Sequence, residues 1–152
     1  MPVNIEITGL EELTRRFRAF PGRLRKAMDI TMLAAITTLW ENVPPYPAKP
    51  TDSTYRRTGT LGKTLGVDMS GKKSGEPQIF KVRTMGSGSL EGVFGTNLKY
   101  APFVIGERSQ TKAHRANKWW TILTIAKNAS AKIVREFNLM ADKLAKFLDR
   151  GV

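Results

Sequence analysis

The 152-residue chain contains no cysteine, so it forms no disulfide bond and offers no thiolate to a metal ion. This absence fits a protein that works in a reducing compartment. Acidic residues are also few, because the chain has 13 Asp and Glu, and they stand mostly singly along the sequence. A metal site would need a cluster of carboxylate oxygens, so the sequence predicts neither a metal ion nor another cofactor.

The chain is equally short of catalytic groups, because His114 is its single histidine. It lies between Lys112 and Arg115, and neighbouring cations disfavour a protonated imidazole. No serine nucleophile motif, carboxylate pair or phosphate-binding glycine loop accompanies it. We interpret His114 as a surface or interface histidine rather than a catalytic base, and predict that the protein is not an enzyme.

Long apolar runs are missing as well. No stretch reaches the roughly 20 residues that a helix needs to span a bilayer. The first residues, Met1 to Ile7, mix polar and apolar side chains too evenly for a secretory signal. We therefore expect a soluble protein with no membrane partner, made and assembled inside a cell.

Positive charge, in contrast, is plentiful. There are 25 Lys and Arg, which gives a formal net charge of +12. A charge so far from zero favours acidic partners such as nucleic acid or an anionic membrane surface, and it says nothing about fold. The length suits one domain, which we place at 1–152.

Hydrophobic periodicity predicts the main elements. Val3, Ile5 and Ile7 alternate with polar residues as in a half-buried strand. Strands are also expected at 78–83 and 90–96, joined as a hairpin, and a further strand is possible at 64–68.

Three helical segments are expected. Thr8 begins the first, whose apolar face is Leu10, Leu13 and Phe17, and Pro21 then kinks or restarts the helix. Apolar residues recur every three or four positions over 23–42 and again over 118–148. The predicted fold class is α+β: a small, mostly antiparallel sheet packed against two long helices. An extended arm at about 44–62 and flexible loops at 70–76 and 84–89 complete it.

The arm begins with four prolines within residues 44–50. Each proline fixes φ and disfavours α-helix in the residue before it, which predicts a stiff, extended segment that cannot fold back into a core. Tyr55, Arg56 and Arg57 follow near its tip. Either this is a disordered surface loop, or it is a clasp in which the two guanidinium groups bind carboxylates of an adjacent subunit and Tyr55 is buried there.

Two motifs carry a resemblance to a known family. The proline-rich stretch leads to Tyr55-Arg56-Arg57-Thr58-Gly59-Thr60-Leu61, and Gly95-Thr96-Asn97-x-x-Tyr100-Ala101-Pro102-Phe103-Val104 follows later. In this order they resemble the tail-component family of long-tailed phages, whose members are called neck, head–tail joining or tail-terminator proteins. The resemblance covers most of the chain. Many relatives continue with an acidic residue and then Gly-Thr, whereas this chain reads Ile-Gly-Glu-Arg-Ser-Gln at 105–110.

The resemblance implies a structural virion protein that forms a ring at the head–tail junction, or at the head-proximal end of the tail, around the DNA channel. Such a protein assembles in the host bacterial cytoplasm and ends in the virion. Its partners are further copies of itself, with a hexamer favoured, and other head–tail connector or tail-tube proteins. The expected subunit-interface residues are Tyr55, Arg56, Arg57, Gly59, Leu61, Tyr100, Pro102, Phe103 and Trp120.

Two of these expectations have alternatives. Phe103 could equally belong to the core. Trp119 and Trp120 cannot both face the core if they are helical, because adjacent helical residues point about 100° apart. One is expected inside, and the other is either partly exposed or an interface anchor.

DNA contact is the alternative function, as a sequence-independent DNA-binding protein. The residues expected to line a DNA channel without reading sequence are Lys72, Lys73, Lys81 and Arg83. Further basic residues stand between Lys99 and Lys118, and others flank Pro21. A solvated surface explains such residues equally well.

Overall fold

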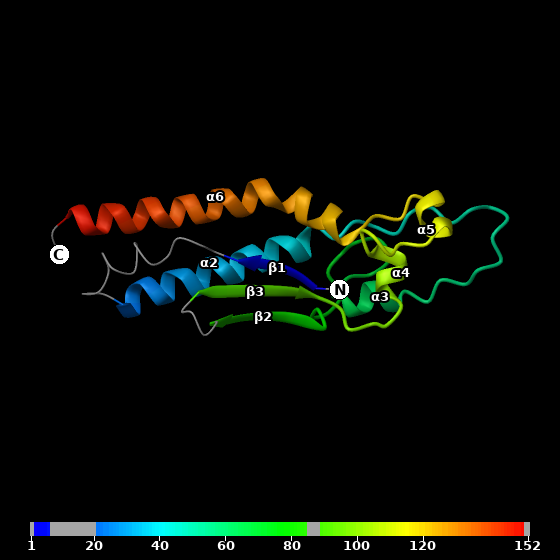
Figure 1. Ribbon diagram of the computed structural model, residues 1–152, viewed down its shortest axis with the longest axis horizontal. Coiled ribbons are helices and arrows are strands. Elements are labelled where there is room, and N and C mark those ends of the chain that lie inside the picture. Colours follow the sequence, from blue (N-terminus) through cyan, green and yellow to red (C-terminus); the bar gives the residue numbers. More distant parts are fainter. Residues whose placement is uncertain (1, 7–20, 85–88, 151–152) are drawn as a thin grey trace.

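The computed structural model describes residues 2–6, 21–84 and 89–150. Figure 1 shows an elongated molecule in which two antiparallel helices, α2 (Pro21–Glu41) and α6 (Ile122–Asp149), run along the long axis beside a sheet. Three short helices gather at one end, and α6 finishes at the other end. The predicted α+β class is confirmed, with a small antiparallel sheet and two long helices.

The sheet contains β1 (Pro2–Glu6), β2 (Ile79–Thr84) and β3 (Leu90–Gly95) in the order β1-β3-β2, and both pairings are antiparallel. The predicted hairpin is therefore confirmed, and Phe94 pairs with Phe80 on one side and Val3 on the other. Ile7 and most of the predicted 84–89 loop lie outside the described residues.

Helix α2 confirms the predicted helix at 23–42, and its described part begins at Pro21, in the first turn, where proline is tolerated. Its buried side chains recur every three or four positions and meet β3 and α6: Leu24, Met28, Met32, Ala35, Ile36 and Leu39. The helix predicted from Thr8 through Phe17 lies outside the described residues.

Helix α6 begins at Ile122, four residues later than the predicted start at 118. Lys118 has a φ of 57°, a left-handed value that interrupts helical backbone. A separate short helix, α5 (Lys112–Ala116), precedes this break. The buried face of α6 is Ile122, Ile125, Ala129 and Ile133.

The strand predicted at 64–68 is wrong. Helix α3 (Thr60–Thr64) occupies its start, and Gly66 turns the chain with a φ of 75°, so the backbone cannot stay extended. Only Val67 makes a β-bridge there, to Lys73. Helix α4 (Ala101–Ile105) was not predicted, because five residues are too few to show a helical period.

Loop 70–76 was expected to be flexible. In the structure its first half is a compact turn, because Asp68 Oδ1 accepts hydrogen bonds from the backbone N–H groups of Ser70 and Lys72 and from the Ser70 hydroxyl. The Ser70 hydroxyl and these N–H groups hold the pKa of the Asp68 carboxyl below its ordinary value.

Candidate protein-interaction site

The arm and the three short helices form one end of the molecule (Figure 1), which we call the distal end and define as residues 44–66 and 97–121. The first motif, Tyr55–Leu61, lies here, and so does the second motif from Asn97 to Val104, whereas Gly95 is the last residue of β3. The two motifs share a cleft between the arm, α3 and α4. Its lining is Tyr46, Tyr55, Arg57, Thr58, Gly59, Thr60, Leu61, Tyr100, Val104, His114 and Trp119.

The arm is fixed at both ends and exposed between them. The Tyr46 backbone N–H donates to Met69 O (2.8 Å), and the Tyr46 hydroxyl accepts from the Gly62 N–H (2.7 Å). Within 48–56 every residue except Ser53 is exposed, and the chain projects further than any other described segment of the distal end (Figure 1). The arm is exposed over 48–56, but it is not extended throughout, because the chain turns at Thr51 and Asp52 and the Ser53 N–H donates to Pro50 O (3.1 Å). The prediction that the arm stays away from the core is wrong at its ends, because Tyr46 packs on the core and Leu61 is part of it.

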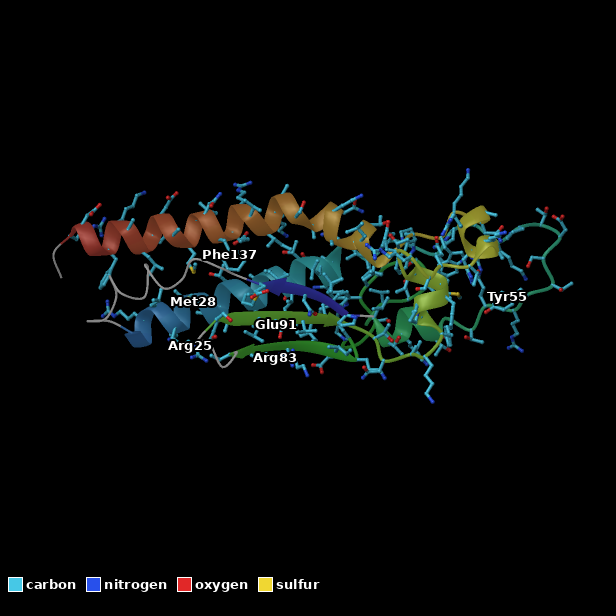
Figure 2. All side chains as sticks on the ribbon, viewed as in Figure 1. Arg25, Met28, Tyr55, Arg83, Glu91 and Phe137 are labelled. Carbon is cyan, nitrogen blue, oxygen red and sulfur yellow. The ribbon has the colours of Figure 1, made fainter. Side chains whose placement is uncertain are left out.

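The two arginines of the arm differ in their surroundings. The Arg57 guanidinium donates to Pro47 O and lies 5.3 Å from the centroid of the Trp119 ring, so it closes the base of the arm. Arg56 is exposed, and Tyr55 beside it is 68% exposed and projects from the arm (Figure 2). Arg56 and Tyr55 are thus open to a partner, whereas Arg57 already serves this chain.

Aromatic rings build the inner wall of the cleft. The centroids of Tyr46 and Trp119 are 4.8 Å apart with an interplanar angle of 58°. His114 meets the same indole edge-on at 5.9 Å, and its Nδ1 lies 2.7 Å from Thr111 Oγ1. Burial raises the pKa of the Tyr46 hydroxyl, and the Gly62 N–H opposes that shift. These groups form a half-buried wall with a neutral hydroxyl at physiological pH.

Helix α4 supplies the other exposed anchors. Tyr100, its N-cap residue, is 44% exposed and Phe103 is 55% exposed, so Phe103 is not a core residue. Pro102 between them is half-buried. These three predicted interface residues therefore lie along one short stretch at the edge of the cleft.

The remaining predicted interface residues are structural in this chain. Trp120 is 8% exposed and its indole N–H donates to Pro45 O (3.1 Å), which ties the arm to the start of α6. Trp119 is half-buried in the cleft, and both tryptophans precede α6 rather than lying within it. Leu61 is buried, and Gly59 adopts a φ of 72° before α3.

Sequence reasoning missed several residues of the site. Gln110 is buried, and its amide donates to Val104 O (2.8 Å) and Trp119 O (3.0 Å), which joins α4 to the segment before α6. Tyr46 was also missed, although it is an aromatic residue among the prolines of the arm. No local pattern marks Gln110, because its partners are defined by folding.

Charge is concentrated at the distal end. It holds nine basic residues against two carboxylates, a net charge of +7 out of the +12 of the whole chain. The basic residues are Lys49, Arg56, Arg57, Lys63, Lys99, Arg108, Lys112, Arg115 and Lys118. Of the two carboxylates, Glu107 accepts a hydrogen bond from the Thr121 hydroxyl.

The four predicted DNA-channel residues have unequal surroundings. Arg83 pairs with Glu91 across the β2–β3 hairpin (Figure 2). Lys73 pairs with Glu41 (3.2 Å) and lies 4.4 Å from the centroid of the Trp40 ring. Lys72 and Lys81 are exposed and form no ion pair among the described residues, although the charge of Lys72 contributes to the lowered pKa of the Asp68 carboxyl. Half of the expected cationic set is therefore neutralised within the chain.

Glu41 joins three elements. Lys132 of α6 lies 3.2 Å from its carboxylate, in addition to Lys73 from the loop after α3. Partial burial raises the pKa of Glu41, but hydrogen bonds and charge from the two lysines outweigh it, so the net pKa is below the ordinary value. The ionised carboxylate is thus the form that the fold prefers.

In the part of the chain that the structure describes, no three His, Asp or Glu side chains gather as metal ligands. Among those same residues, no helix combines the length and apolar character needed to cross a bilayer. No protein family, curated protein or solved structure matches the chain in comparisons of sequence and fold.

Proposed function

We propose that this protein is a structural component of a tailed phage or prophage virion, and that it forms a ring at the head–tail junction or at the head-proximal end of the tail. The observation that carries the proposal is the distal end. There a proline-rich arm, fixed at both ends, presents Tyr55 and Arg56 to solvent, and Tyr100 and Phe103 are also exposed at this end. The two motifs that resemble the phage tail-component family line one cleft.

Exposed aromatic and arginine side chains of this kind are suited to protein contact. Large, rigid side chains contribute most of the energy at interfaces, and arginine binds carboxylates in two-pronged geometry. The exposed part of the arm makes few contacts with the rest of the chain, so few intramolecular contacts are broken when it binds a partner. The molecule is elongated, so the distal end can face an adjoining protein while the sides of the body meet neighbouring copies in a cyclic head-to-tail arrangement.

A sequence-independent DNA-binding protein is the rival function, supported by the net charge of +12. The ion pairs of Arg83 and Lys73 argue against the sheet and its neighbouring loop as the main DNA surface. In the proposed ring, Lys72 and Lys81 contribute at most weak, non-specific attraction to DNA in the channel.

The oligomeric state of the purified protein tests this proposal. Light scattering over a range of protein concentration and salt, with and without duplex DNA, should show assembly that rises with protein concentration and does not require DNA. A protein that stays monomeric throughout, and binds duplex DNA tightly only at low salt, would favour the DNA-binding rival instead.

A further inference from the structure

We propose that the distal end docks an acidic surface of a different protein, and that neither a second copy of this chain nor nucleic acid is its main partner. The inference rests on the proposed function, in which that protein belongs to an adjoining ring or tail tube. In this inference, the arm and α4 bind a protein other than this chain. Contacts between copies of this chain would then involve other surfaces.

Charge is the first argument. Nine basic residues against two carboxylates make the distal end strongly cationic, and a surface of opposite charge would dock there with the least repulsion. Arg56 and Lys99 are exposed and stand next in sequence to Tyr55 and Tyr100, whose rings are exposed as well. An apolar centre with a charged rim is the usual anatomy of a protein–protein interface.

The cleft supplies a place for one side chain of the partner. Tyr55 and Tyr100 stand at its mouth, and Trp119 and Tyr46 line its wall. Met69, 48% exposed, packs beside Gly59 at its edge, and the nearest Met69 atom is 3.5 Å from the position that a Gly59 Cβ would take. An aromatic or aliphatic side chain of the partner would fill the cleft. Carboxylates on either side of it in the partner would bind Arg56 and Lys99.

The ring geometry disfavours nucleic acid. A platform for single strands offers flat, open aromatic faces on which bases stack. Here the Trp119 ring is inclined to Tyr46, Trp120 and His114 at angles of 58°, 50° and 76°, and the Arg57 guanidinium covers part of it. The inner rings therefore pack on each other and do not form a stack that bases could extend.

A second copy of this chain offers few carboxylates without a nearby cation among the described residues, and the exceptions, such as Glu6 and Glu76, are far apart in sequence. Several carboxylates already have partners: Asp29 with Arg25, Glu41 with Lys73 and Lys132, and Glu91 with Arg83. Those of α6 alternate with cations along the helix, as Glu136, Asp142 and Asp149 do with Arg135, Lys143 and Lys146. This distribution favours an acidic surface on another protein as the partner of the distal end.

Binding of a synthetic peptide tests the inference. The probe is a peptide of alternating Glu and Tyr, and its partner probe replaces each Glu by Gln. Wild-type protein should bind the Glu peptide by fluorescence anisotropy and bind the Gln peptide far more weakly. Arg56→Glu combined with Lys99→Glu should weaken binding of the Glu peptide about tenfold or more, while the oligomeric state stays that of the wild type.

Matched variants distinguish binding at the distal end from an effect of the net charge of the whole chain. Lys72→Glu combined with Lys81→Glu changes the net charge by the same amount on the body of the molecule, so it should leave peptide affinity nearly unchanged. Tyr55→Ala combined with Tyr100→Ala should weaken binding, whereas Ile30→Ala combined with Leu33→Ala removes equally exposed apolar side chains from α2 and should not.

Four outcomes would overturn the inference. The first is failure of the wild type to bind the Glu peptide, and the second is an equal loss of peptide affinity in both charge-reversal variants. The third is displacement of the bound peptide by duplex or single-stranded DNA at a lower concentration than unlabelled peptide requires. The fourth is loss of self-association in the Arg56→Glu/Lys99→Glu variant. The last result would assign the distal end to contact between copies. Peptide binding by a chain that never assembles would instead refute the ring and leave this inference standing.

Discussion

At the scale of single residues, Gly92 determines how closely α2 approaches the sheet. A Cβ at this position of β3 would lie 2.6 Å from Met32 Sδ and 2.7 Å from Ile36 Cγ2. Both partners are fully buried side chains of α2. The helix therefore packs on bare backbone, and the position tolerates no side chain without displacement of its neighbours.

Gly92→Ala should lower the free energy of unfolding by about 1–3 kcal/mol, because an added methyl group forces buried side chains out of their rotamers. Urea denaturation of the purified protein measures this. Gly75→Ala is the control, since nothing lies within 4 Å of the position that its Cβ would take. Equal stability of the two variants would show that α2 does not pack on β3 this closely.

At the scale of elements, Glu41 connects the end of α2 to α6 and to the loop after α3 through its two lysines. Its folded-state pKa is below the ordinary value of 4.5. The resulting stabilisation is fully present above that value and is lost as the pH falls below it, because the carboxylate is then protonated in both states.

Glu41→Gln should therefore reduce stability at neutral pH by less than about 1 kcal/mol, since the three side chains are largely exposed. The difference from wild type should vanish in acid, below the folded-state pKa of Glu41. Urea denaturation across this pH range checks the prediction, with Glu76→Gln as a control carboxylate that has no ion pair among the described residues. A difference that stayed constant with pH would exclude the ion pairs as its cause.

The elements that sequence analysis found are those with a strong period. The 2-residue alternation of β1 and β2 and the 3.6-residue recurrence of α2 and α6 each extend over enough residues to be recognised. β3 is buried throughout and shows no alternation, so it was expected only as the hairpin partner of β2. The short helices α3, α4 and α5 escape, because five residues show no period and their ends depend on turns such as Gly66 and Lys118.

The site was predictable in its exposed part only. Tyr55, Arg56, Tyr100 and Phe103 were recognised from the two motifs, and the structure leaves all four open to solvent. The inner wall depends on tertiary contact between segments far apart in sequence, such as Tyr46 with Trp119. No local pattern distinguishes Leu61 and Trp120, which are core residues here, from interface anchors.

At the scale of the whole molecule, the chain has a body that contains the sheet and the two long helices, and a distal end that we propose makes the contacts with partner proteins. The body holds its sheet on one side of two long helices, and its cations are balanced in part by Asp29, Glu41 and Glu91. The distal end keeps most of its charge unbalanced and its aromatic side chains exposed.

The most direct test of the central claim is electron microscopy of the concentrated, purified protein. We predict closed rings of one rotational symmetry, with sixfold favoured. Their abundance should grow with protein concentration and should be unaffected by nuclease treatment. Single particles the size of one chain at every concentration, or particles that vanish when DNA is removed, would contradict it.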